Sequence, residues 1–116
     1  MASVVRVVPS AAQSVTGNSG YKQTPPGSGV SLLVNVTAVT GTTPSAVFSV
    51  EWTNDGVTFA QASPADAFPA ITVVGATVMR FIQKAAGYRV VWTLTGTTPV
   101  FTFDITSDVD GGGFIY

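Results

Sequence analysis

The chain of 116 residues contains neither cysteine nor histidine. Without cysteine no disulfide bond can form, so disulfides cannot stabilise the fold. Histidine is the commonest general base and the commonest metal ligand in proteins. Nucleophilic hydrolysis by a serine or threonine therefore lacks its usual base. We expect no enzymatic activity, no metal site and no cofactor.

Charge is also scarce. Only 9% of the residues are charged, against about 25% in ordinary soluble domains. The net charge is −1 and the five basic residues form no run, so no basic surface for nucleic acid is expected. No stretch approaches the roughly 20 apolar residues of a membrane helix, and the first residues do not resemble a signal peptide. We therefore expect no membrane partner and synthesis inside the cell.

The acidic residues offer little chemistry. Glu51 and Asp104 fall on predicted outward faces of strands, and no spacing indicates a catalytic pair. The sequence around Asp108 and Asp110 resembles part of a calcium loop but lacks the further oxygen ligands and the closing glutamate. A solvated, glycine-rich tether is the favoured interpretation of that segment.

Apolar and polar residues alternate along much of the chain, and one turn sequence occurs twice. Thr-Gly-Thr-Thr-Pro stands at residues 40–44 and 95–99, each time between two alternating runs. Alternation with period two is typical of a strand with one buried face. Glycine allows a positive φ in a tight connection, and proline ends the turn without needing a backbone donor. The pattern predicts two β-hairpins of one design in an all-β protein.

Other turn signals divide residues 30–106 into about eight strands. Asn54 and Gly56 predict a tight turn, with Asp55 capping it through its side chain. Ser63 predicts one helical turn, and residues 70–74 predict a short strand. Such spacing is typical of a sandwich or barrel, and we predict a single β-sandwich with a jelly-roll or immunoglobulin-like Greek-key topology. Its expected core contains Phe48, Trp52, Trp92, Leu94, Phe101 and Phe103.

The N-terminal 29 residues differ in composition, with prolines and glycines among small polar residues. They predict an extended arm with a short β-like run at Val4–Val8, followed by residues 9–29, which form no helix or long strand. The arm is either a mobile terminus or long loop, or it becomes ordered on a partner. In the second case its valines would add a strand to the sheet edge of a neighbour.

Residues 107–116 predict a glycine-rich tether that ends in three large apolar residues. These residues either fold back onto the sandwich or dock on a neighbouring subunit, where aromatic anchors commonly carry binding energy. The candidate partner-binding residues of both chain ends are Val4, Val5, Val7, Val8, Tyr21, Phe114, Ile115 and Tyr116.

Three segments resemble small virion structural proteins of tailed bacteriophages: residues 32–44, 50–56 and 88–99. The resemblance covers about residues 30–106 and is one of sequence style, without a fixed motif. It implies a β-sandwich built into the particle, most like a capsid decoration (cement) protein. Such a protein would sit on the capsid exterior as a homotrimer, bind the major capsid protein and stabilise the shell by bridging capsomers.

The sequence also allows a second function. The chain could be a module of a tail, fibre or head fibre that binds host-surface carbohydrate. Trp52 and Trp92 could then line a sugar-binding face. Both lie in the inward register of their runs, which favours the core.

Overall fold

The computed structural model describes residues 4–23 and 29–108. This part of the chain confirms the all-β prediction, since it forms one antiparallel sheet and contains no helix. The strands are β1 (Val4–Gln13), β2 (Gly17–Asn18), β3 (Lys22–Gln23), β4 (Gly29–Thr53), β5 (Ala60–Ala67), β6 (Gly75–Ile82) and β7 (Gly87–Asp108). Nothing in the described residues is a helix able to cross a membrane.

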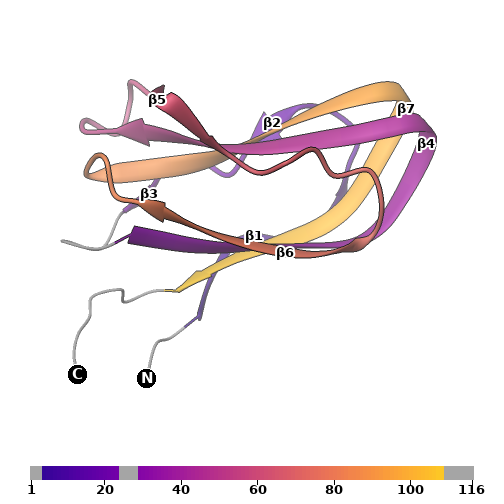
Figure 1. Cartoon of the computed structure of the whole chain (residues 1–116), viewed down its shortest axis with the longest axis horizontal. Helices are drawn as coiled ribbons and strands as arrows, with labels where there is room; N and C mark the ends of the chain where they lie inside the picture. Colours follow the sequence, from indigo (N-terminus) through magenta and orange to yellow (C-terminus); the bar gives the residue numbers. More distant parts are fainter. Residues whose placement is uncertain (1–3, 24–28, 109–116) are drawn as a thin grey trace.

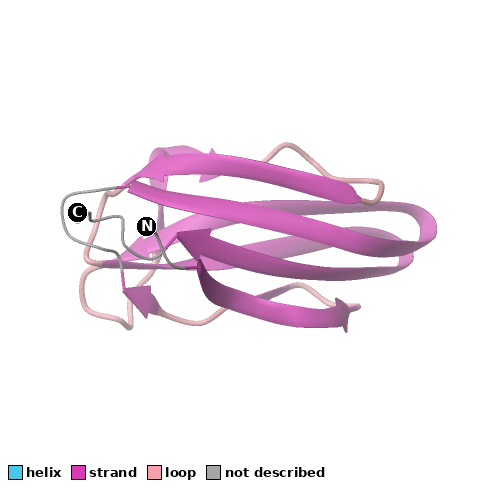
Figure 2. Ribbon diagram, turned by 90° about the horizontal axis from the view of Figure 1, so that it is seen from below, coloured by secondary structure: helices cyan, strands magenta, loops and turns pink. Residues whose placement is uncertain are grey.

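Two long strands, β4 and β7, form the spine of the sheet. They have 25 and 22 residues and pair with each other almost from end to end. Figure 1 shows both strands curving together at one end of the molecule, so that the sheet folds over on itself. The view in Figure 2 shows the same ribbons turning back at that end. The sheet is continuous through the bend, and its two halves face each other.

The two halves have different edge strands, after which we name them. The β1/β6 layer contains β1, residues 100–108 of β7, residues 29–40 of β4, and β6. The β3/β5 layer contains β2, β3, residues 87–95 of β7, residues 45–53 of β4, and β5.

The two Thr-Gly-Thr-Thr-Pro segments are the bends of β4 and β7. The prediction of two hairpins was therefore wrong, because the runs on either side of each segment belong to one strand. The segments lie opposite each other, with Thr42 paired to Thr97. Gly41 and Gly96 both have φ of 116°, and Thr43 and Thr98 both have φ of 47°. Both glycines have a positive φ as predicted, but each lies at a bend within one of the paired strands β4 and β7 and does not close a hairpin.

The bends are also in close backbone contact. A Cβ atom on Gly41 would lie 2.8 Å from the carbonyl oxygen of Thr98. A Cβ atom on Gly96 would lie 2.6 Å from the carbonyl oxygen of Thr43. The contacts are reciprocal, so a local twofold axis relates the two segments.

This twofold relation extends to the whole fold, because the two halves of the chain correspond strand by strand. β1 pairs with the last part of β7, as β5 pairs with the last part of β4. β2 and β3 pair with the first part of β7, as β6 pairs with the first part of β4. The pair Arg6–Thr106 has its counterpart in Gln61–Glu51, each residue displaced by 55 positions. Every strand pairing of the described residues joins one half of the chain to the other.

The core lies between the two layers. Phe103 of the β1/β6 layer packs edge-on against Phe48 and Trp92 of the β3/β5 layer, with ring centroids 4.9 and 5.2 Å apart. The predicted burial of Phe48, Trp52, Trp92, Phe101 and Phe103 is confirmed, whereas Leu94 is only partly buried. The sequence did not single out several further core residues, among them Val7, Val8, Phe68 and Phe81.

The extended N-terminal arm is not confirmed, because β1 is a ten-residue strand paired with β7 of its own chain. The short β-like run predicted at Val4–Val8 lies in β1, but the strand continues to Gln13, into the residues 9–29 that were predicted to form no long strand. β1 passes through Pro9, which lies in a register shift between Val8 and Ala11. Proline is tolerated there because an edge strand at a bulge does not need its backbone donor.

Three smaller predictions also differ from the structure. The helical turn at Ser63 is wrong, since Ser63 lies in β5, within a register shift against β4. Residues 70–74 form no strand, and Ile71 makes only an isolated bridge to Ala46. β7 continues beyond the predicted end of the sandwich, and Ser107 is buried.

Candidate functional site

The acidic residues considered for catalysis lie apart and have structural partners. The Glu51 carboxylate forms an ion pair with Arg89, at 2.7 Å. Asp104 accepts a hydrogen bond of 3.2 Å from the side-chain amide of Asn35. Glu51 lies in the β3/β5 layer and Asp104 in the β1/β6 layer. Because their alternating strands turn both side chains away from the core, they do not converge on a common substrate position. The described residues contain no group of three potential metal ligands.

The turn after β4 is held by one carboxylate. Oδ1 of Asp55 accepts hydrogen bonds from the backbone amides of Thr58, at 2.7 Å, and Val57, at 2.8 Å. It also accepts one of 3.0 Å from the Thr53 hydroxyl. The predicted side-chain cap is thus confirmed. The hydrogen bonds from Thr58, Val57 and Thr53 favour the ionised form and lower the pKa of Asp55 from 3.8 to about 2.

We expect Asp55→Asn to weaken the fold at neutral pH and to make the stability of the fold less dependent on pH below about pH 4. Because the folded pKa lies below the unfolded one, ionised Asp55 stabilises the fold fully above about pH 4, and this contribution is lost as the pH falls toward 2. Urea midpoints measured from pH 7 to 2 should therefore fall less steeply below pH 4 in the variant than in the wild type. Val57→Ala keeps the backbone donor and should keep the wild-type slope. Equal slopes for Asp55→Asn and the wild type would contradict this role.

An open cleft of about 280 Å³ lies beside this turn. It is lined by Trp52, Thr53, Asn54, Asp55, Thr58 and Ala85. The Trp52 indole donates a hydrogen bond of 2.9 Å to Asp66, and the Lys84 ammonium lies 2.9 Å from the same carboxylate. Lys84 also lies over the Trp52 ring, 5.6 Å from its centroid. These groups contact one another, and only 6% of Trp52 is exposed. The cleft therefore lacks the open aromatic face on which a sugar would stack.

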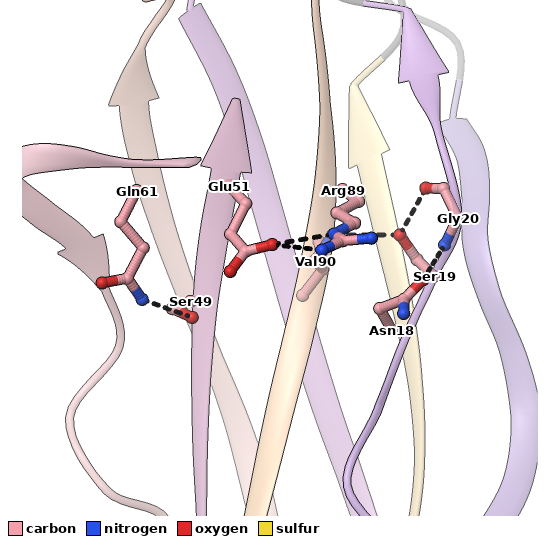
Figure 3. Close-up of polar contacts among 8 residues, drawn as sticks. All are labelled: Asn18, Ser19, Gly20, Ser49, Glu51, Gln61, Arg89 and Val90. Carbon is pink, nitrogen blue, oxygen red and sulfur yellow. Dashed lines mark hydrogen bonds and ion pairs between the residues drawn. The ribbon is translucent and has the colours of Figure 1, made fainter. Parts of the chain in front are cut away.

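The outer face of the β3/β5 layer is crossed by a band of polar contacts, shown in Figure 3. The Arg89 Nε donates a hydrogen bond of 2.8 Å to Glu51, and the Arg89 guanidinium lies 4.2 Å from the Phe59 ring centroid. On one side of this pair, the Gln61 amide lies within 3.5 Å of the Ser49 hydroxyl. On the other side, the Val90 amide donates a hydrogen bond to Ser19. Contacts within the chain therefore occupy the polar groups of this band.

Exposed apolar side chains occur on both outer faces, since Val47 of the β3/β5 layer is 37% exposed, and a larger group of them lies on the β1/β6 layer. Leu33 of β4 is paired with Val78 of β6, and they are 39% and 62% exposed. Ile82, at the end of β6, is 78% exposed. We call Leu33, Val78 and Ile82 the β6 patch. Val73 and Val74, which immediately precede β6, are also exposed.

The residues predicted to bind a partner are not brought together. Val4 and Val5 pair with Asp108 and Ser107 of the same chain. Val7 and Val8 belong to the chain's own core. Tyr21 is 48% exposed, and its ring lies against Gly87. Phe114, Ile115 and Tyr116 lie outside the described residues.

Sequence reasoning separated the two faces of β6 correctly, with Val78, Arg80 and Ile82 on one face. It did not identify the β6 patch, because the alternation alone does not say which face turns outward. The burial of Phe81 decides this.

Comparison with family models, curated proteins and solved structures finds no match to this chain.

Proposed function

We propose that the chain is a non-enzymatic virion structural protein, a capsid decoration protein of a tailed phage. In this proposal it is made in the host cytoplasm, binds the major capsid protein on the capsid exterior and assembles with further copies, as a homotrimer in the form that the resemblance implies. We also propose to class the folded-over sheet as a β-sandwich, since its two layers face each other across one core.

The observation that carries the proposal is the β6 patch in a chain with few charges. Leu33 and Val78 are paired neighbours, and Arg80 lies between Val78 and Ile82 on the same face. Exposed apolar side chains gathered on an outer face are a feature of contacts between subunits. The polar groups on the opposite outer face contact one another, so they contribute less to recognition. With 9% charged residues, the chain also has little electrostatic repulsion between copies. Such a surface suits a subunit that acts in a dense array.

Stabilisation of a shell does not require a strong individual contact. A decoration protein present at every joint contributes many small interfaces, and together they resist separation of neighbouring capsomers. Because the bound subunit favours the intact shell over the opened one, binding raises the temperature at which the shell opens. This action needs no catalytic group.

The proposal predicts that the purified chain binds particles that lack it and raises the temperature of DNA release by several degrees. Among the predicted partner-binding residues whose exposure the structure describes, Tyr21 is the one on the surface, so Tyr21→Ala should weaken binding about tenfold, as expected for an aromatic anchor. Cosedimentation and thermal DNA release measure the two effects. Val57→Ala changes a side chain that is 81% exposed and should bind as the wild type does. Absence of the chain from sedimented particles would contradict the proposal.

The alternative, a carbohydrate-binding module of a tail or fibre, has less support. It would use exposed aromatic rings in a groove, but Trp52 and Trp92 are only 6% and 4% exposed. Binding to host polysaccharide, with few copies per particle on a stained gel, would favour this alternative over the decoration role.

A further inference from the structure

The edge strands of the described sheet differ in how well they are protected from further pairing. β1 and β5 each carry a proline, Pro9 and Pro64, inside a register shift. β2 and β3 have only two residues each. Prolines, bulges and short lengths are the usual devices that keep an edge strand from pairing with another molecule.

β6 has none of these three devices, and Arg80 is its one charged residue. Its eight residues pair with β4 without a register shift and include no proline. In the twofold relation between the two halves of the chain, β6 corresponds to β2 and β3, which are two separate short strands. The two halves therefore differ at this edge. β4 is the only strand with which β6 pairs in the described residues. A long, regular edge strand with exposed apolar side chains is suited to β-strand addition.

We propose that β6 pairs antiparallel with β6 of a second copy, around a twofold axis at Val78. In this register Val78 faces Val78 of the second copy, and Ile82 faces the second copy's Val74. Arg80 faces the second copy's Ala76. The exposed apolar residues at positions 74, 78 and 82 are spaced evenly about the axis, so each one meets an apolar residue.

Charge selects this register over its neighbours. A register centred on Arg80 would place two arginines directly opposite each other, which is destabilising in an antiparallel pair. A register centred on Met79 would place Val78 opposite Arg80. A shift by one residue would pair an outward side chain with an inward one. Of the registers centred on Val78, Met79 and Arg80, the one centred on Val78 joins apolar residues and separates the two Arg80 side chains.

The contact would extend the β1/β6 layer across both molecules. Since Leu33 lies beside Val78 in the sheet, a continuous apolar row would run from Leu33 through both Val78 residues to Leu33 of the second copy. The β6 patches of the two copies would then form one shared surface. The occupant is a second copy because the chain supplies a matching strand with the same evenly spaced apolar residues.

This inference deepens the proposed function, on which its biological meaning rests, by assigning a self-contact of the assembly. A twofold contact uses the same surface on both copies and differs from a threefold contact, which uses two different surfaces. It would join pairs of subunits whether or not the same subunits also form trimers.

A disulfide tests the register, because the chain contains no cysteine and a single engineered one can link only to another copy. Residues directly opposite in an antiparallel pair have Cα atoms about 4.5–5.5 Å apart, within disulfide range. Under mild oxidation of the purified chain, Val78→Cys should convert mostly to a covalent dimer. Arg80→Cys and Val57→Cys should remain monomeric on a non-reducing gel, and a mixture of Ala76→Cys and Arg80→Cys should form the mixed dimer. Circular dichroism establishes that each variant is folded.

Linkage of Val78→Cys no faster than of Val57→Cys would overturn the contact, and self-linkage of Arg80→Cys would overturn the register. Sedimentation provides a second test, in which Val78→Lys should weaken the self-association of the full chain at least about tenfold and Val57→Lys should not. Unchanged association of Val78→Lys would also overturn the contact. Particle binding without Val78 linkage would contradict this inference alone, whereas linkage without particle binding would contradict the proposed function alone.

Discussion

Replacing Gly96 with alanine should lower the free energy of unfolding by about 3 kcal/mol, since it combines backbone strain with a close contact. Gly96 has φ of 116°, a conformation that residues with a Cβ rarely adopt. A Cβ atom there would lie 2.6 Å from the carbonyl oxygen of Thr43, which cannot move aside as a flexible side chain can. Gly41→Ala should have a similar effect, because the opposite bend makes the reciprocal contact.

Urea denaturation followed by circular dichroism measures both changes. Gly56 provides the control, since it also has a positive φ of 78° but nothing lies within 4 Å of the added Cβ. Gly56→Ala should cost roughly 1 kcal/mol, the strain of the left-handed conformation alone. Equal losses for Gly96→Ala and Gly56→Ala would mean that the contact between the bends contributes nothing.

Phe103→Ala should be at least as damaging, with an expected loss of about 3–5 kcal/mol. Phe103 is fully buried between the layers and contacts Phe48 and Trp92. Removing its ring would leave a cavity lined by aromatic groups of the opposite layer, which the surrounding strands cannot collapse to fill. The urea midpoint should fall accordingly.

The double variant Phe48→Ala/Phe103→Ala tests the contact itself. Because the two rings pack directly against each other, the loss in the double variant should be smaller than the sum of the single losses. Val57→Ala, at an exposed position, should change the free energy of unfolding by less than about 0.5 kcal/mol. A loss below about 1 kcal/mol for Phe103→Ala would contradict the central place of this ring.

Alternation in the sequence was sufficient to assign the residues of β4 before the bend to two faces. Val30, Leu32, Val34 and Val36 lie on one face as expected, and all four are buried. The alternation ends at Ala38, which is exposed, because a register shift separates Val36 from Ala38. Side-chain burial follows from the local pattern, whereas such an irregularity depends on the strand that lies alongside.

Strand pairing could not be predicted in the same way. Alternation says that a strand has one buried face, but it does not say which segment is its neighbour. The two Thr-Gly-Thr-Thr-Pro segments were therefore interpreted as local turns, although each bends opposite the other. Thr43 and Thr98 lie in these two bends, and their positive φ likewise could not be predicted from the local sequence.

The positions of the candidate binding residues could not be predicted either, because they also depend on strand pairing. Residues 1–29 were assigned to an extended arm whose valines would bind a partner, yet Val7 and Val8 lie in the core. The partner strand that makes this possible is β7, whose paired residues stand about a hundred positions later in the sequence. The outward face of β6, in contrast, became recognisable only once Phe81 was seen to be buried.

The pairing of strands only between the two halves of the chain has a consequence for its synthesis. When residues 4–53 have left the ribosome, none of their strands has yet met the strand with which it pairs. β1 waits longest, because its pairing partners are residues 101–108. Until then the valines of the nascent chain have no sheet to cover them, and such stretches are prone to aggregate. Folding is therefore delayed until the end of β7 has emerged, and a nascent chain that stops before Asp108 lacks part of the strand that β1 needs.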